Sequence, residues 1–168
     1  MGYGFFGTRF CDLELKAAIM KKHWILVANG SMARFFSRAS VGDPLLAVET
    51  FDFPAGRLKD NELERERQGH GSNDNSSAVV HFEPHTSTHK KVLHHFAIEL
   101  AKRLEEGAVD GEYETFWLIA PGPLLSETKA CLNRGVAYRL QWSHDADFTG
   151  LDVGTLESRL RELHRSAR

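Results

Sequence analysis

The chain has 168 residues, of which 42% are hydrophobic and 26% charged, and its formal net charge is -2. These values are typical of a globular protein and argue against a dominant basic surface for long nucleic acids, although a local basic patch remains compatible with them. No apolar run approaches the roughly 20 residues that a membrane helix needs, so we expect no membrane association.

Residues 1–19 are predicted to be a loosely ordered extension ahead of a single domain at residues 20–168. This segment has no basic region, sustained apolar core or small-residue cleavage site, so it does not resemble a signal peptide. It is expected to be loosely held or used in a dimer contact, which leaves a homodimer open. The two cysteines, Cys11 and Cys131, form no disulfide framework or metal-ligand spacing. A reducing cytoplasm is therefore the expected compartment.

The first regular elements are predicted to be strands. Residues 24–28 are a continuous apolar run without polar alternation, which indicates a central strand that is buried on both faces. Asn29 and Gly30 then form a strong turn signal, and a second strand follows over 33–37. A third strand is expected over 45–53.

Residues 57–83 are predicted to be a long mobile loop. Alternating charges are followed by a polar, glycine-containing run that cannot bury much apolar surface. Loops of this length inside a compact domain are often functional, and a disordered surface excursion is the alternative interpretation. A short strand over 78–82 is expected to close the loop.

The second half alternates helices with strands. An apolar stripe predicts a helix over 87–106, with Gly107 as its C-terminal cap. Strands are expected over 115–120 and 138–143, with a helix over 123–133 between them. Leucines predict a last helix, which Asp152 can cap. Strand–helix–strand repeats require parallel pairing, so the predicted fold class is a three-layer α/β/α fold with a mixed central sheet.

Several ordered pieces of the chain resemble the bacterial family called protein required for attachment to host cells. The pieces are Trp24-Ile25-Leu26-Val27-Ala28-Asn29-Gly30-Ser31 with Ala33-Arg34, Phe82-Glu83-Pro84, Phe96-Ala97, Ala120-Pro121 and Asp145-Ala146-Asp147-Phe148-Thr149. The resemblance covers about residues 20–165. It implies a fold similar to the middle domain of archaeal and eukaryotic peptide release factors.

The same resemblance suggests a place for function. In those release factors a mobile loop carrying Gly-Gly-Gln precedes a long helix, and here the equivalent place holds Gln68-Gly69-His70-Gly71. Glycines allow the backbone to approach RNA closely, but the different order does not support peptide release. The resemblance therefore implies a non-enzymatic cytoplasmic module that needs no cofactor, binds the ribosome, tRNA or rRNA, and affects attachment indirectly.

Candidate RNA- or ligand-binding residues are the basic side chains in and around the loop, together with the glutamine–glycine run. They are Arg34, Arg57, Lys59, Arg65, Arg67, Gln68, Gly69, His70, Gly71, Lys90 and Lys91. Acidic residues interleaved in the loop weaken this basic surface. For Arg34, a structural salt bridge to an acid at the end of the sheet is the alternative role.

Two further interpretations rest on other residues. A cluster of histidines suggests a metal site at His81, His85 and His89, and hence a small metal-dependent hydrolase, although solvated or capping histidines explain the same pattern. Asp145 and Asp147 suit either a paired-acid site or a turn and helix cap. A surface or secreted adhesion protein that acts directly in attachment is the remaining alternative, and it needs a secretion route.

Overall fold

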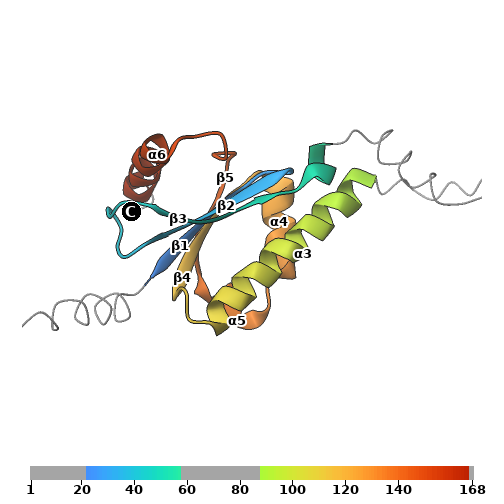
Figure 1. Cartoon of the computed structure of the whole chain (residues 1–168), viewed down its shortest axis with the longest axis horizontal. Helices are drawn as coiled ribbons and strands as arrows, with labels where there is room; N and C mark the ends of the chain where they lie inside the picture. Colours follow the sequence, from blue (N-terminus) through green and yellow to red (C-terminus); the bar gives the residue numbers. More distant parts are fainter. Residues whose placement is uncertain (1–21, 58–87, 167–168) are drawn as a thin grey trace, which may run out of the picture.

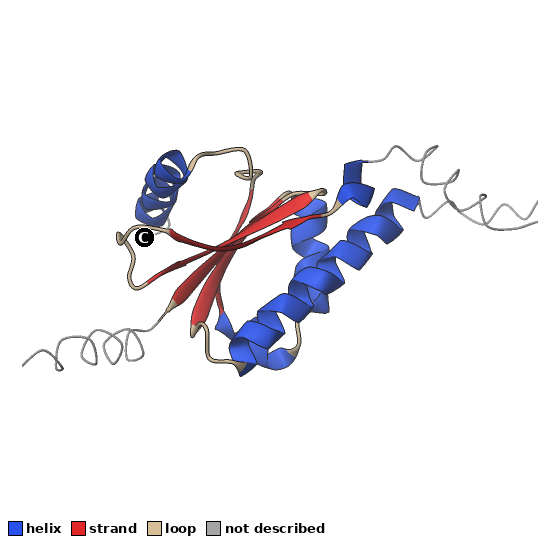
Figure 2. Ribbon diagram, in the orientation of Figure 1, coloured by secondary structure: helices blue, strands red, loops and turns tan. Residues whose placement is uncertain are grey.

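The computed structural model describes residues 22–57 and 88–166. Five strands and five helices lie in this part of the chain (Figures 1 and 2). The strands are β1 (His23–Ala28), β2 (Met32–Arg38), β3 (Leu46–Asp52), β4 (Thr115–Ala120) and β5 (Leu140–Asp145). The helices are the 3-10 helix η1 (Pro54–Arg57), α3 (Thr88–Val109), α4 (Gly122–Cys131), α5 (Arg134–Arg139) and α6 (Val153–Ser166).

The strands form one mixed sheet in the order β3-β2-β1-β4-β5. β2 pairs antiparallel with β1 and β3, whereas β4 pairs parallel with β1 and β5. Consequently β1, β3, β4 and β5 all end at the same edge of the sheet, which we call the carboxyl edge. The predicted mixed sheet is confirmed.

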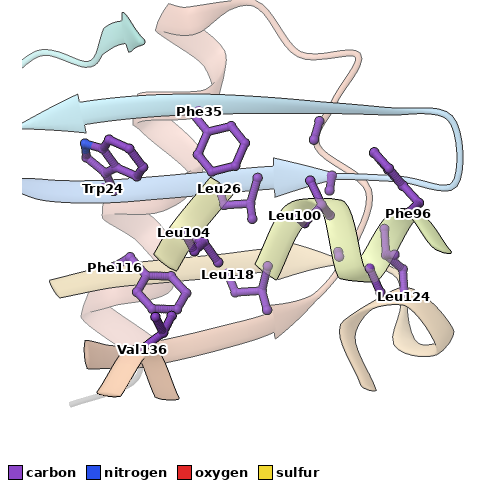
Figure 3. Packing of buried hydrophobic residues seen from close by; sticks show 14 of the residues in the cluster. Trp24, Leu26, Phe35, Phe96, Leu100, Leu104, Phe116, Leu118, Leu124 and Val136 are labelled. Atoms are coloured by element: carbon purple, nitrogen blue, oxygen red, sulfur yellow. The ribbon is translucent and has the colours of Figure 1, made fainter. Parts of the chain in front are cut away.

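Helices cover both faces of this sheet. α3, α4 and α5 lie on one face and α6 lies on the other, so the fold is a three-layer α/β/α arrangement (Figure 1). All six residues of β1 are buried, as the uninterrupted apolar run predicted. Trp24 and Leu26 point into the core beneath α3 (Figure 3), and Ile25 and Val27 belong to the core beneath α6.

The prediction for Gly107 was wrong. This glycine lies inside α3 rather than after it, and a Cβ there would stand 2.6 Å from the Trp24 indole ring. The residue is glycine because helix and indole approach closely, which is a tertiary requirement. The helix continues for two more residues and ends at Val109.

The predicted strand over 138–143 was displaced by two residues, because a short helix precedes it. The Asn133 side chain accepts a hydrogen bond from the Val136 amide and so caps α5, which includes Tyr138. β5 then begins at Leu140. Trp142 on β5 is only half-buried, whereas Trp117 on β4 is part of the core.

Some predictions fall on other parts of the chain. The extension at 1–19, nearly all of the loop at 57–83 and the short strand at 78–82 lie outside the described residues. Within the described ranges, none of the helices combines the length and apolar character needed to cross a membrane.

Candidate nucleic-acid interface

The start of α3 lies at the carboxyl edge of the sheet, beside η1. Phe53 follows β3 and stacks on Phe96 of α3, with 4.6 Å between ring centroids. A Cβ on Gly56 of η1 would stand 1.6 Å from the Gly30 carbonyl oxygen, so η1 packs directly on the turn between β1 and β2. This packing places Arg57, the last residue of η1, at the same edge as the first turns of α3 (Figure 1).

The first two turns of α3 carry basic and titratable side chains and no acid. These residues are His89, Lys90, Lys91, His94 and His95. The second half of the helix is different, because it holds the acids Glu99, Glu105 and Glu106 together with Lys102 and Arg103, and its last turn holds no basic residue. The first two turns of α3 are therefore without acids, whereas its second half carries charges of both signs.

This order is the reverse of what helix stability favours. The partial positive charge at a helix N-terminus attracts acids and repels lysines, by about 0.3–1 kcal/mol for each charge in the first turn. Lys90 and Lys91 lie in that turn, and Glu106 lies near the other end of the helix. The placement of these charges thus opposes the helix dipole.

A hollow of about 240 Å³ lies where α3 approaches α4. Lys90, Lys91 and His94 from α3 and Glu127 from α4 line it. Glu127 Oε2 lies 2.9 Å from His94 Nδ1, so this acid is engaged with the histidine and partly offsets the positive charge of the hollow. His94 and Glu127 were not predicted as site residues, because their pairing joins positions 33 residues apart.

Arg57 adds a further cation near α3. Its Nη2 lies 3.6 Å from Asp52 Oδ1, and both side chains are largely exposed. Exposed ion pairs of this kind contribute about 0–1 kcal/mol, so an incoming anion can replace Asp52 at little cost. Arg57, Lys90 and Lys91 are therefore the predicted binding residues that the structure brings to one edge.

Arg34 does not join this group. Its Nη1 donates hydrogen bonds to the carbonyl oxygens of Thr149 and Leu151, at 3.1 and 2.7 Å, and its guanidinium lies over the Phe36 ring. These partners belong to the α6 side of the sheet, opposite α3. Arg34 is structural, but its partners are carbonyl oxygens rather than the acid that was expected, because the connection from β5 to α6 crosses β2 here.

The Asn29 side chain connects the β1–β2 turn to the segment after β5 through hydrogen bonds. Its Nδ2 donates to Asp147 Oδ2 at 3.1 Å and to Thr149 Oγ1 at 2.8 Å, while its Oδ1 accepts from the amides of Ser31 and Met32. Burial raises the pKa of Asp147, but hydrogen bonds from Thr149 and Asn29 outweigh burial and lower it overall. Asp147 therefore serves as a charged turn residue, one of its two expected roles.

Asp145 lies against the start of α4. A Cβ on Gly122 would stand 2.9 Å from Asp145 Oδ2, so the glycine leaves room for this carboxylate at the N-terminus of the helix. The position is electrostatically favourable for an acid. This contact tests neither of the two roles expected for Asp145, which stay predictions.

The remaining candidates lie elsewhere. His81 and His85 fall outside the described residues, as do Lys59, Arg65, Arg67 and the run from Gln68 to Gly71. His89 is in the first turn of α3. Across residues 22–57 and 88–166, no three side chains of the metal-ligating types gather into one group.

Comparison with known proteins gives a family and a fold-level likeness. The sequence model of the family described as "Protein required for attachment to host cells" matches residues 24–160. A solved structure titled "Archaeal protein" is similar, with a TM-score of 0.47 and 15% identity, and the archaeal translation termination factor aRF1 gives 0.45 and 12%. The chain spans 41% of the length of each, and 94% of it is covered. No curated protein sequence matches it.

Proposed function

Since the chain belongs to the family of proteins required for attachment to host cells, we propose that it is a cytoplasmic, non-enzymatic RNA-binding module that affects attachment indirectly. The proposed contact is the start of α3 at the carboxyl edge of the sheet. The proposed partner is ribosomal RNA or tRNA.

The observation that carries this proposal is the basic first turn of α3, which holds Lys90 and Lys91 and no acid. The helix dipole disfavours cations in the first turn of a helix, where Lys90 and Lys91 lie, and an anion bound there would offset that effect. The positive end of the helix dipole and the two ammonium groups attract the same ligand, a phosphate. The arrangement therefore supports binding of a phosphate backbone rather than a purely structural role.

The hollow beside the lysines supports the same conclusion. It brings Lys90 and Lys91 together with His94, and η1, which ends at Arg57, lies at the same edge of the sheet. Contacts of this kind to RNA are mainly electrostatic, so they require little sequence specificity. A chain with a net charge of -2 can bind RNA in this way only through a local patch, which explains why overall charge is uninformative.

The test compares two variants of the full chain with equal charge loss. Lys90→Gln/Lys91→Gln removes both cations from the proposed contact. Arg159→Gln/Arg161→Gln removes two exposed cations from α6, on the opposite face of the sheet. Binding to ribosomal RNA is measured by fluorescence anisotropy over a series of salt concentrations.

We expect the lysine variant to bind at least tenfold more weakly than wild type at low salt. Its slope of log affinity against log salt should fall by about 1.4, because each phosphate contact to single-stranded RNA contributes about 0.7. The arginine variant should bind as wild type does. Equal losses in both variants, or no salt-sensitive binding by wild type, would rule out the proposed contact.

A further inference from the structure

A cluster of nitrogen-bearing side chains lies at the opposite edge of the sheet, on the face that α6 covers. His23 begins β1 and pairs in register with Arg38, the last residue of β2. Both surround Trp117 of β4: the Arg38 guanidinium carbon lies 4.4 Å from the indole centroid, and the His23 ring meets the indole edge-on at 5.2 Å. His164 of α6 stacks on the same indole at 5.5 Å.

Arg38 and His23 are buried with unused hydrogen-bonding atoms. Only 5% of Arg38 and 7% of His23 is exposed. Among the described residues, Arg38 Nε and Nη2 and His23 Nε2 have no hydrogen-bond partner. A buried guanidinium without partners is costly, because desolvation is not compensated by hydrogen bonds.

The two unused nitrogens of Arg38 are the pair that binds an oxyanion side-on. Nε and Nη2 donate in parallel along one edge of the planar guanidinium, a geometry that matches two oxygens of a phosphate or carboxylate. His23 Nε2 is a third free nitrogen, since Nδ1 contacts Thr115 Oγ1 at 2.9 Å. These three nitrogens of Arg38 and His23 therefore match the oxygens of a tetrahedral oxyanion.

Electrostatics at this edge favour an anion as well. Burial, then Arg38, then His164 lower the pKa of His23 to about 4, so the imidazole is neutral there without a counter-charge. Asp43 in the turn after β2 is the acid that attracts Arg38, but burial has the larger effect and lowers the pKa of Arg38. Residues 40–44 of that turn are exposed.

We propose that Arg38, with His23 and His164 beside it, forms a binding site for a phosphate-type oxyanion at this edge of the sheet. The site is independent of the proposed RNA contact, which lies at the carboxyl edge beside α3. The oxyanion is either free phosphate or a terminal phosphate of a nucleotide chain, since both present the same oxygens to the guanidinium.

The test measures the thermal unfolding midpoint of the full chain against inorganic phosphate, with chloride keeping ionic strength constant. For wild type we expect the midpoint to rise by about 5–10 °C at 100 times Kd, because a ligand that binds only the folded state stabilises it. Oligoribonucleotides with and without a 5′-phosphate distinguish the two sources.

Three variants make the assignment specific. Arg38→Met should raise the midpoint in phosphate-free buffer, because an unpaired buried charge is removed, and should abolish the response to phosphate. Arg38→Lys keeps the charge without the side-on geometry and should lose most of the response. Arg34→Met removes a guanidinium from the same strand whose partners are carbonyl oxygens, and it should keep the full response.

Each outcome of these measurements either supports or overturns the proposed oxyanion site. A wild-type midpoint that does not move with phosphate overturns the proposal, and so does a full response in Arg38→Met. Phosphorus NMR line broadening with wild type gives an independent readout that needs no variant to fold. Lys90→Gln/Lys91→Gln should keep the phosphate response, so failure of the RNA proposal leaves this one intact.

Discussion

The two faces of the sheet are held by different interactions. Beneath α3, α4 and α5 lies a continuous apolar core rich in aromatic rings (Figure 3). In this core the Tyr113 hydroxyl donates to the Leu104 carbonyl oxygen at 2.6 Å. Beneath α6 the apolar core is smaller, and polar groups make much of the connection. Arg34 donates to the carbonyl oxygen of Leu151, and Glu157 accepts from the Leu45 amide.

Because of this difference, we expect one face of the sheet to supply stability and the other to respond to pH and anions. Apolar burial beneath α3 does not depend on a titrating group, and the larger core lies there, so we expect that face to supply most of the stability. The α6 face holds the buried titratable groups His23 and Arg38. We therefore expect pH and anions to act on the α6 face first.

The largest effect should come from the apolar face. Leu104→Ala removes a fully buried side chain from beneath α3 and should lower the free energy of unfolding by about 3–5 kcal/mol. Leu160→Ala on α6 is the matched change and should cost about 2–3 kcal/mol, because the single helix on that face can settle into the space. Urea unfolding measures both, and a larger loss for Leu160→Ala would reverse the comparison.

The pH dependence should belong to the α6 face. The pKa of His23 is about 4 in the folded chain against 6.5 for an ordinary histidine, so the unfolded chain takes up a proton first as pH falls. The contribution of neutral His23 to the free energy of unfolding is complete above pH 6.5. It is lost as pH falls toward 4, which lowers the free energy of unfolding by up to about 3 kcal/mol. His23→Gln should flatten this part of the curve of unfolding free energy against pH. An unchanged curve would contradict the account.

A smaller loss is expected at the carboxyl edge. Asn29→Ala removes the hydrogen bonds that join the β1–β2 turn to Asp147 and Thr149, and should lower the free energy of unfolding by about 2 kcal/mol. Hydrogen exchange of the Ser31 and Met32 amides should quicken, since both donate to Asn29. Protected amides in the variant would show that another group replaces the side chain.

The smallest effect on the free energy of unfolding is expected from an exposed ion pair on α6. Arg159 and Glu162 form an exposed ion pair at 3.2 Å on α6. Arg159→Ala should change the free energy of unfolding by less than about 0.5 kcal/mol, because exposed pairs gain little in water. A loss above 1 kcal/mol would mean that surface charge also contributes to holding α6.

Local patterns predicted most of the fold. The strand at 115–120 was located to the residue, and Asp152 caps α6 by accepting from the Thr155 amide at 3.0 Å, as predicted. α5 was missed because its six residues are too few for periodicity to show. Gly107 was misread because its neighbour, the Trp24 indole, lies far away in sequence.

The candidate sites likewise combine features that local sequence predicts with features that depend on contacts between distant residues. Lys90 and Lys91 were predicted from local charge, and the start of α3 could be placed from sequence alone. Their hollow could not, since Glu127 comes from another helix. The pairing of His23 with Arg38 and the carbonyl partners of Arg34 depend on strand register and on contacts over more than 100 residues, which one sequence does not reveal.

The most direct test of the central claim is one substitution at each end of α3. Lys91→Glu places an acid in the first turn, whereas Lys102→Glu makes the same change among the acids Glu99, Glu105 and Glu106. The account predicts that Lys91→Glu stabilises the chain by about 0.5 kcal/mol while weakening RNA binding tenfold or more, and that Lys102→Glu destabilises it and leaves binding unchanged. Equal RNA affinities of Lys91→Glu and wild type would contradict it.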